Sequence, residues 1–162
     1  MDQDTTLAFS AHDHAACRAA TLARAEEVAR ARNLRLTPVR RRTLEILLEA
    51  HKALGAYEVL DRLVEDGFAR QPPVAYRALD FLVENGLAHR IRRLNAFAAC
   101  LHPGEPHMPA FLICDRCHTL AEAPGTAVAE AMHQAAGAVG FAIDRMSIEA
   151  TGLCPACQEA AG

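Results

Sequence analysis

The sequence has no tryptophan and few other aromatic residues. Of its 162 residues, 5% are aromatic, whereas 51% are hydrophobic and 23% are charged. Any core must therefore be built mainly from Leu, Ala, Val and Ile side chains. A chain of this length is sufficient for one ordinary domain or two small ones.

Long apolar runs are also missing. No uninterrupted hydrophobic run approaches the roughly 18 residues of a membrane span. The first residues, MDQDTTLAFSAHDHAAC, are acidic and lack the basic start and apolar block of a signal peptide. We therefore expect a cytoplasmic protein with no membrane partner. In that setting the six cysteines favour metal binding or redox chemistry over disulfides.

The net charge of −3 conceals two halves of opposite sign. Residues 18–100 hold 15 of the 17 Lys and Arg residues against 10 acids, a balance of +5. Residues 101–162 hold two Arg against seven acids, a balance of −5. This asymmetry indicates two parts with different roles.

The basic half has the pattern of a winged helix-turn-helix. After a polar, flexible tail over residues 1–17, helical periodicity begins at about Ala19. Thr37 and Pro38 form an N-cap and first-turn pair. A winged domain over residues 18–100 places its last helix in the major groove of DNA. Its expected elements are helices at about 19–32, 39–52, 56–67 and 72–86, then two short strands within 87–100 around a turn at Leu94–Asn95.

The acidic half reads as a small α+β domain. Residues 101–109, LHPGEPHMP, form a Pro- and Gly-rich hinge. Residues 110–162 are too few to be stable comfortably alone, which favours dimerisation, metal binding or both. The expected elements are a strand at about 110–114, a second strand ending at Glu122, a helix from Pro124 to about Val139, and a third strand at about 141–151.

Four cysteines in the acidic half form two C-x-x-C pairs. The two intervening residues let both thiolates of a pair face one tetrahedral ion at about 2.3 Å. Disulfides or a redox couple are alternatives, but two such pairs in a cytoplasmic chain favour zinc. Four thiolates leave no open coordination position, so we predict a closed structural zinc site. The ligands are Cys114, Cys117, Cys154 and Cys157.

A second group of possible ligands surrounds the hinge. Taken singly, each has an ordinary alternative, such as a hairpin histidine, a small buried cysteine or a solvated glutamate. Together they form a mixed tetrahedral set drawn from both halves, which favours a reversible site that fixes the angle between them. The set is His89, Cys100, His107 and Glu122. His102 and His118 are close enough to substitute, and Cys17 has no assigned role.

The stretch PPVAYRAL carries the expected DNA contacts. Arg77 lies near the start of its helix, and its guanidinium can address guanine O6 and N7 together. Tyr76 and Tyr57 can reach a phosphate or a thymine methyl group. We expect a run of arginines to contact phosphates, which position the protein without specifying sequence. This run is Arg40, Arg41 and Arg42, and for any single one the ordinary alternative is a solvated helix face.

Four stretches, RLTPVRRRTLEIL, PPVAYRALDFLVENGLAHRI, FLICDRCHTLAE and IEATGLCPACQ, resemble the Fur (ferric uptake regulator) family, most closely its zinc uptake regulator branch. The resemblance covers about residues 20–158. It implies a homodimeric, metal-responsive transcription repressor, not an enzyme, that binds a palindromic DNA operator and has no small-molecule substrate. In this family the N-terminal winged-helix domain binds DNA and the C-terminal α+β domain dimerises.

The resemblance also implies two zinc ions per chain. The structural ion matches the two C-x-x-C pairs, and the regulatory ion matches His89, Cys100, His107 and Glu122 in order. The family's base-contacting Tyr and Arg fall on Tyr57 and Arg77. Zinc in the regulatory site then favours the operator-binding dimer, and repression controls genes of zinc uptake.

Two departures from the family pattern bear on function. Val74–Ala75 stands where Thr-Val usually precedes Tyr-Arg, which removes a hydroxyl that could reach a phosphate. The His-rich cluster of iron-sensing members is replaced by HPGEPHMPAFLIC, and a thiolate ligand suits zinc better than Fe(II) or Mn(II). Two alternatives stay open: an iron- or manganese-responsive regulator, and a thiol oxidoreductase that uses Cys114 and Cys117.

Overall fold

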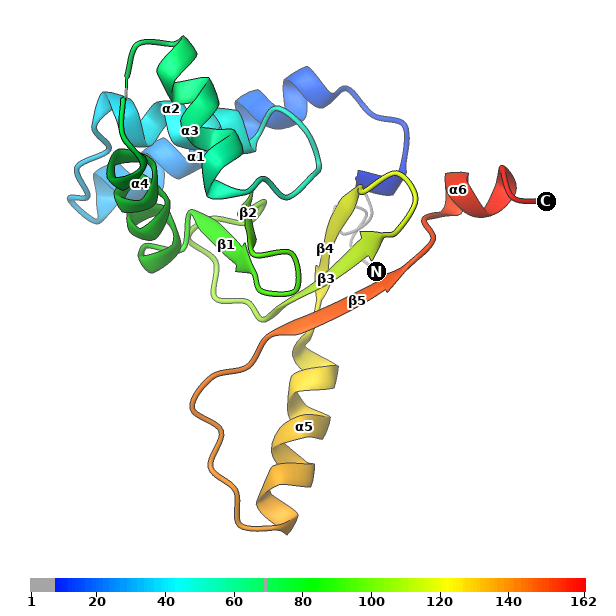
Figure 1. Cartoon of the computed structure of the whole chain (residues 1–162). Helices are drawn as coiled ribbons and strands as arrows, with labels where there is room; N and C mark the ends of the chain where they lie inside the picture. The colour runs from blue at the N-terminus through cyan, green and yellow to red at the C-terminus, as the bar shows by residue number, and fades with distance from the viewer. Residues whose placement is uncertain (1–7, 69) are drawn as a thin grey trace. The chain divides into compact units, whose positions relative to one another are not determined.

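The computed structural model describes residues 8–68 and 70–162, so the first seven residues of the expected tail lie outside the described residues. The chain divides into two compact units (Figure 1). The first unit spans His12–Glu105, and the second spans Pro106–Gly162 together with the described residues before His12. The boundary between Glu105 and Pro106 lies inside the stretch where a hinge is expected.

In the described residues of the first unit, four helices precede a two-stranded hairpin, in the order of a winged helix-turn-helix. Each of the expected helices and strands is present, and most of the helices are shorter than the sequence pattern predicted. The elements are α1 (His14–Ala31), α2 (Pro38–Leu47), α3 (Ala56–Glu65), α4 (Pro72–Glu84), β1 (Ala88–Ile91) and β2 (Ala96–Ala99).

Side-chain caps explain where the helices begin. The Thr37 hydroxyl accepts a hydrogen bond from the backbone N–H of Arg40 at 3.5 Å, and Pro38 occupies the first turn of α2, as predicted. At α3, the backbone N–H of Gly55 donates to Glu58 Oε2 at 2.7 Å. These bonds satisfy donors that a helix N-terminus otherwise leaves without partners.

Helix α1 begins earlier than its sequence pattern suggested. The expected start was about Ala19, but the helix begins at His14. Asp13 is the N-cap, and its Oδ1 accepts a hydrogen bond from the backbone N–H of Ala16 at 3.1 Å. Residues 14–17 therefore belong to a capped helix rather than to a flexible tail.

The core of the first unit is aliphatic, as the scarcity of aromatic residues predicted. Leu44 of α2, Leu63 of α3 and Leu79 of α4 are completely buried and belong to one cluster. Phe97 of β2 packs in the same cluster and pairs through backbone bonds with Leu54, which lies between α2 and α3. The hairpin is thereby fixed against the helices.

The hairpin is antiparallel. Two ligand candidates, His89 and Cys100, lie at the end of the hairpin that is away from its turn. Its register runs from Ala88 opposite Ala99 to Ile91 opposite Ala96. Asn95 adopts φ 47°, which closes the turn at the position predicted for it.

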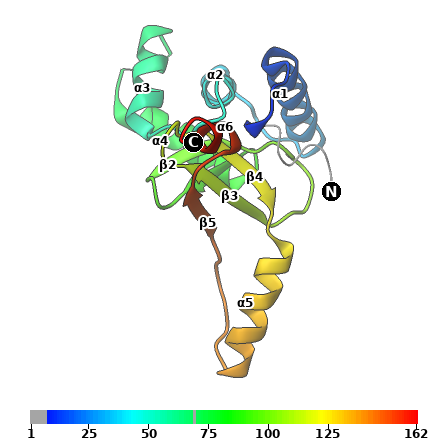
Figure 2. The same ribbon diagram turned by 90° about the vertical axis from the view of Figure 1, so that its right-hand side faces the viewer.

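The second unit is built on a three-stranded mixed sheet (Figure 2). The central strand β3 (Pro109–Cys114) pairs antiparallel with β4 (Leu120–Pro124) and parallel with β5 (Ile148–Gly152). Helix α5 (Thr126–Ala138) lies between β4 and β5 in sequence, and α6 (Pro155–Glu159) follows β5. The predicted α+β class is confirmed.

Two boundaries in this unit differ from the prediction, and one further element is present. Helix α5 begins at Thr126 rather than at Pro124, because Pro124 still pairs with Pro109 in the sheet and the N–H of Gly125 donates to the Met108 carbonyl at 2.7 Å. The third strand is confined to Ile148–Gly152, so residues 141–147 lie outside it. Helix α6 was not predicted; it begins after Cys154 with a proline in its first turn.

No helix among the described residues combines the length and apolar character that crossing a membrane requires.

Candidate metal centres and nucleic-acid interface

Four cysteines of the second unit converge where β3 and β5 end. Because these strands are parallel, Cys114 lies opposite Gly152, and the chain then turns back beside it. The Sγ atoms of Cys117 and Cys154 are 3.7 Å apart. None of the six cysteines, each within the described part of the chain, is in a disulfide. The four converging sulfurs lie within 4.8 Å of one another and are those of Cys114, Cys117, Cys154 and Cys157.

Hydrogen bonds favour the thiolate forms of Cys114 and Cys117. Backbone N–H groups of Cys117 and Cys154 lower the pKa of Cys114 to about 6, and the Cys154 N–H lies 3.4 Å from its sulfur. A hydrogen bond with the Thr119 hydroxyl lowers the pKa of Cys117. Burial and the neighbouring thiols raise the pKa of Cys157 to about 12.

The neighbouring thiols therefore oppose the ionisation of Cys157. A group of four sulfurs that can become thiolates only against mutual repulsion fits a divalent cation, which compensates their charge. The donor set and its convergence match a closed tetrahedral zinc site. No disulfide competes for these sulfurs.

A second pair of ligand candidates lies within the second unit. Glu122 is on β4 opposite Phe111, and its side chain is 4% exposed. Its Oε1 lies 2.7 Å from Nε2 of His107. A carboxylate this deeply buried needs a cationic or hydrogen-bonding partner. His107 and Glu122 thus offer one nitrogen and one oxygen ligand from the same unit.

The first unit holds a corresponding pair on its hairpin. His89 lies on β1 opposite Ala98, and Cys100 follows β2 directly, with its N–H donating to the Leu87 carbonyl at 3.0 Å. Cys100 is 1% exposed. A ring nitrogen of His89 and the Cys100 sulfur lie within 4.8 Å of each other. This pair offers one nitrogen and one sulfur ligand.

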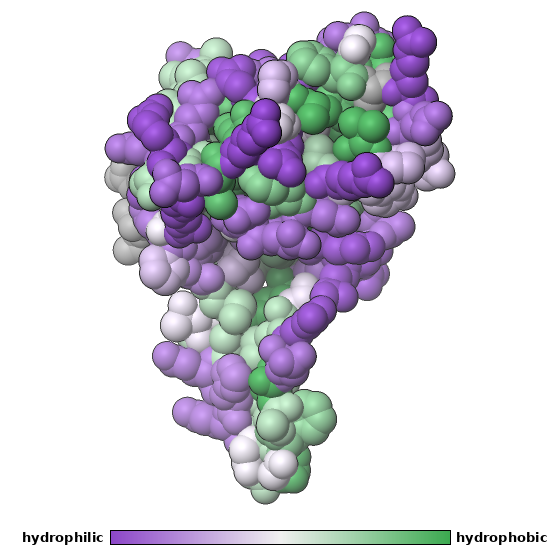
Figure 3. All heavy atoms as spheres, turned by 90° about the vertical axis from the view of Figure 1, so that its left-hand side faces the viewer, coloured by the Kyte–Doolittle hydropathy of each residue, from purple (hydrophilic) through white to green (hydrophobic). Residues whose placement is uncertain are grey.

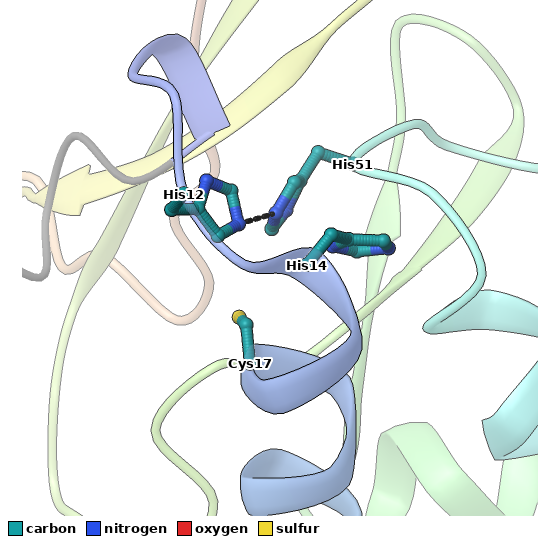
Figure 4. Close-up of side chains that lie close together, drawn as sticks. All are labelled: His12, His14, Cys17 and His51. Atoms are coloured by element: carbon teal, nitrogen blue, oxygen red, sulfur yellow. Dashed lines mark hydrogen bonds between the residues drawn. The ribbon is translucent and has the colours of Figure 1, made fainter.

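Among the described residues, His102 and His118 belong to no group of converging ligand-type side chains. His118 is exposed and adopts φ 61° in the turn after Cys117. Sequence reasoning missed a further group in the first unit, drawn in Figure 4. The sequence signal for this group was H-x-H-x-x-C at residues 12–17, but the fourth member of the group, His51, is remote in sequence. The group is His12, His14, Cys17 and His51.

Helix α4 turns its predicted DNA-contacting residues outward. Ala75 and Leu79 are completely buried, whereas Tyr76 is 41% exposed and Arg77 is exposed as well. Within residues 8–68 and 70–162, Arg77 forms no hydrogen bond or ion pair. Tyr57, at the start of α3, is 63% exposed, and its ring lies edge-on to that of Tyr76 with centroids 6.4 Å apart.

The departure from the family pattern at Val74–Ala75 lies on the buried side of α4. Ala75 is completely buried and Val74 packs against the core cluster. The outward-facing contacts of this turn are therefore left to Tyr76 and Arg77.

The arginine run of α2 is largely engaged in contacts with other residues of the same chain. The Arg40 guanidinium stacks on Phe81 at 3.7 Å from the ring centroid and donates to the Arg35 carbonyl at 2.7 Å. Hydrogen bonding to Glu26, with further attraction from Glu45, raises the pKa of Arg41.

Arg42 bonds Asp66 at 2.6 Å and also contacts Glu45 and Glu49. These arginines connect α2 to α1 and to the end of α3. The reading as a simple solvated helix face therefore does not describe them, and their expected phosphate contacts stay predictions.

Comparison with known proteins agrees with these features. No family model matches the chain. The chain is 42% identical over 139 residues to the zinc uptake regulation protein of Escherichia coli (strain K12), which covers 85% of this chain and 81% of that protein. The zinc uptake regulation protein of Shigella flexneri matches with the same identity and coverage.

Solved structures agree with the sequence relatives. A zinc uptake regulator complexed with zinc and DNA superimposes with a TM-score of 0.83 at 40% identity, covering 89% of this chain and 97% of that one. The crystal structure of holo XcZur has a TM-score of 0.76 at 40% identity, covering 93% and 100%. The chain therefore belongs to the Fur (ferric uptake regulator) family, in its zinc uptake regulator branch.

Proposed function

We propose that this protein is a zinc-responsive, DNA-binding transcriptional repressor that controls zinc uptake genes. The observation that carries the proposal is that each unit holds its own pair of ligand-type side chains. His89 and Cys100 belong to the first unit, His12–Glu105, called the winged unit below. His107 and Glu122 belong to the second unit, which contains Pro106–Gly162 and is called the sheet unit. In our proposal one metal ion binds both pairs, together called the divided set, so that the relation between the units depends on that ion.

The four converging cysteines hold a structural zinc ion in this proposal. Strand β3 supplies Cys114, the following turn Cys117, and the region after β5 the other two. Their role is to tie the C-terminal end of the sheet unit to the end of β3. Because all four ligands come from the protein, the site leaves no position for a substrate, and we infer a regulator rather than an enzyme.

The regulatory site is proposed to be His89, Cys100, His107 and Glu122. Zinc supplies a tetrahedral cross-link when it binds such a set. The thiolate of Cys100 favours zinc over Fe(II) or Mn(II), which prefer oxygen-rich surroundings. Each unit contributes a pair held by its own backbone: the hairpin register fixes His89, and the β3–β4 pairing fixes Glu122. The number of zinc ions per chain is then two.

The ligand residues control DNA binding through differential affinity. A metal shifts an equilibrium between two arrangements only by binding one of them more tightly. The arrangement in which both pairs face one another binds more tightly, because it offers four ligands instead of two. In a dimer, that arrangement is the one that presents both α4 helices to successive major grooves of a palindromic operator.

Exposed apolar residues support a homodimer through the sheet unit. On α5 and directly after it, Val128, Met132, Val139 and Phe141 are exposed by between 51% and 79%. Figure 3 shows hydrophobic atoms on the lower part of the molecule, where α5 and the following segment lie. A surface this apolar marks an interaction site, and a second copy is the partner that a palindromic operator requires.

Cys100→Ser tests the regulatory site. This variant should keep its fold and its structural zinc but lose zinc-dependent operator binding, because one ligand of the divided set is removed. His107→Ala should behave in the same way from the other unit. His133→Ala is the matched control, since His133 is an exposed histidine of α5.

Two measurements read the result: zinc content of the reduced protein, and operator binding by fluorescence anisotropy during titration with zinc, Fe(II) or Mn(II). An ordinary zinc requirement in Cys100→Ser would show that the ligand assignment is wrong. A response to Fe(II) or Mn(II) at lower concentration than to zinc would replace the zinc sensor by an iron or manganese sensor.

A further inference from the structure

Three imidazole rings and one thiol of the winged unit converge beside the start of α1 (Figure 4). His12 precedes the helix, His14 and Cys17 lie three residues apart in its first turn, and His51 comes from the connection between α2 and α3. Residues with that helical spacing share one face. The four candidate ligand atoms lie within 4.8 Å of one another.

His14 is oriented as a metal-bound histidine usually is. Its Nε2 lies 3.0 Å from the backbone carbonyl of Glu49. A carbonyl only accepts, so Nε2 carries the proton and Nδ1 carries the lone pair. Nδ1 is buried and has no hydrogen-bond partner among the described residues. A carbonyl that receives the outer N–H of a histidine is the common support behind a metal ligand.

The other two rings point nitrogens at each other. Nε2 of His12 and Nε2 of His51 are 3.0 Å apart, and the His14 and His51 ring centroids are 4.7 Å apart. Four ligands around a tetrahedral zinc ion, at about 2.0–2.3 Å from it, are separated by about 3.3–3.7 Å. The 3.0 Å between the two nitrogens and the 4.8 Å upper limit for the whole group lie on either side of that spacing.

The His51 ring is also in the protonation state that a metal requires. Burial lowers the pKa of His51 to about 4, with further lowering by His14 and His12. The ring is neutral near pH 7, so its nitrogen lone pair is available without displacement of a proton.

We propose that His12, His14, Cys17 and His51 form a further zinc site within the winged unit, separate from the two sites proposed above. Three imidazoles and one thiolate are ligands that suit zinc, with copper and nickel as competitors for the imidazoles. Because all four positions are filled by the protein, the site stabilises structure and has no open position for catalysis.

The consequence of such a site is local. It ties the beginning of α1 to the connection that leads from α2 to α3, and α3 carries Tyr57 at its start. Zinc that binds only the folded unit stabilises it by RT ln(1 + c/Kd), where c is the free zinc concentration, so the stabilisation grows with the logarithm of that concentration. The stability of the winged unit would then depend on zinc at this site, as well as on zinc bound by His89, Cys100, His107 and Glu122.

Metal content of the full-length protein tests the proposal. After dialysis against a zinc buffer under reducing conditions, His51→Ala and Cys17→Ser should each hold about one zinc ion fewer per chain than the wild type. His133→Ala is the matched control and should hold as much as the wild type. Combining His51→Ala with Cys100→Ser should lower the content by about two, because the two sites have no ligand in common.

Cobalt replacement supplies a second readout. With zinc retained in the four-cysteine site, cobalt added to the wild type and to Cys100→Ser should give a thiolate-to-cobalt absorption band. That band should disappear from Cys100→Ser when Cys17→Ser is added.

Equal zinc content in the wild type, His51→Ala and Cys17→Ser would overturn the proposal, and the histidines would then be a hydrogen-bonded cluster only. An equal loss in His133→Ala would also overturn it, because the lost zinc would be nonspecific. If His51→Ala does not fold, as judged by circular dichroism, Cys17→Ser decides the question alone. Because Cys100→Ser reports on the divided set, failure of either proposal is recognised separately.

Discussion

Replacing Arg77 with alanine separates base recognition from fold stability. The Arg77 side chain is exposed and forms no hydrogen bond or ion pair within residues 8–68 and 70–162. Its removal should therefore change the free energy of unfolding by less than about 0.5 kcal/mol. If Arg77 reads a guanine with both guanidinium donors, its loss should cost about 1–3 kcal/mol at the specific site.

That cost corresponds to about a 5- to 150-fold weaker specific affinity, since each 1.4 kcal/mol is about tenfold. The assay is fluorescence anisotropy with zinc present, on a duplex selected from a random library by the wild-type protein and on a scrambled duplex of equal length. The specific duplex should lose affinity and the scrambled duplex should keep most of it.

Arg40→Ala provides the contrast. Arg40 stacks on Phe81 and donates to the Arg35 carbonyl, so its removal should lower the free energy of unfolding by about 1–2 kcal/mol. An equal affinity loss of Arg77→Ala on both duplexes, with the salt slope smaller by about one, would refute base readout and make Arg77 a phosphate contact.

Two further substitutions test the core and the dimer. Leu79→Ala should lower the free energy of unfolding by about 2–5 kcal/mol in denaturant titrations, because Leu79 is completely buried, whereas Leu94→Ala, at a position 47% exposed, should change it by less than about 0.5 kcal/mol. Phe141→Asp should weaken self-association by about tenfold or more in sedimentation equilibrium, since an unpaired charge would have to be buried in the interface; unchanged association would exclude Phe141, which is 66% exposed, from the dimer surface.

Local patterns in the sequence were sufficient for most of the fold. Thr37–Pro38 identified the start of α2, and Asn95 lies in the predicted hairpin turn, because caps and turns depend on residues close together in the chain. The start of α1 was placed too late. Asp13 is as good a cap as Thr37, but the polar residues around it hide the onset of helical periodicity.

Charge pattern alone did not predict the intramolecular ion pairs of the arginine run in α2. Arg41 and Arg42 lie in the same run, yet their partners Glu26 and Asp66 come from α1 and from the residue after α3. Helix packing decides which carboxylates reach which guanidinium groups, and no local rule supplies it. Arg77, by contrast, is outward because the buried positions of α4 follow helical spacing, which the sequence does display.

The group of four cysteines and the group of three histidines with Cys17 differ in how far the sequence could predict them. The cysteine group was predicted because each C-x-x-C pair already holds two thiols close together in the chain. The sheet then needs only to bring the two pairs side by side. The histidine group has one prepared part, H-x-H-x-x-C, and a single remote residue, His51. His51 has no neighbouring ligand in sequence, and only the packing of the α2–α3 connection against the start of α1 places its ring beside His12 and His14. A solitary histidine is weak evidence for a metal site, and the strength of this one comes from contacts that the fold creates.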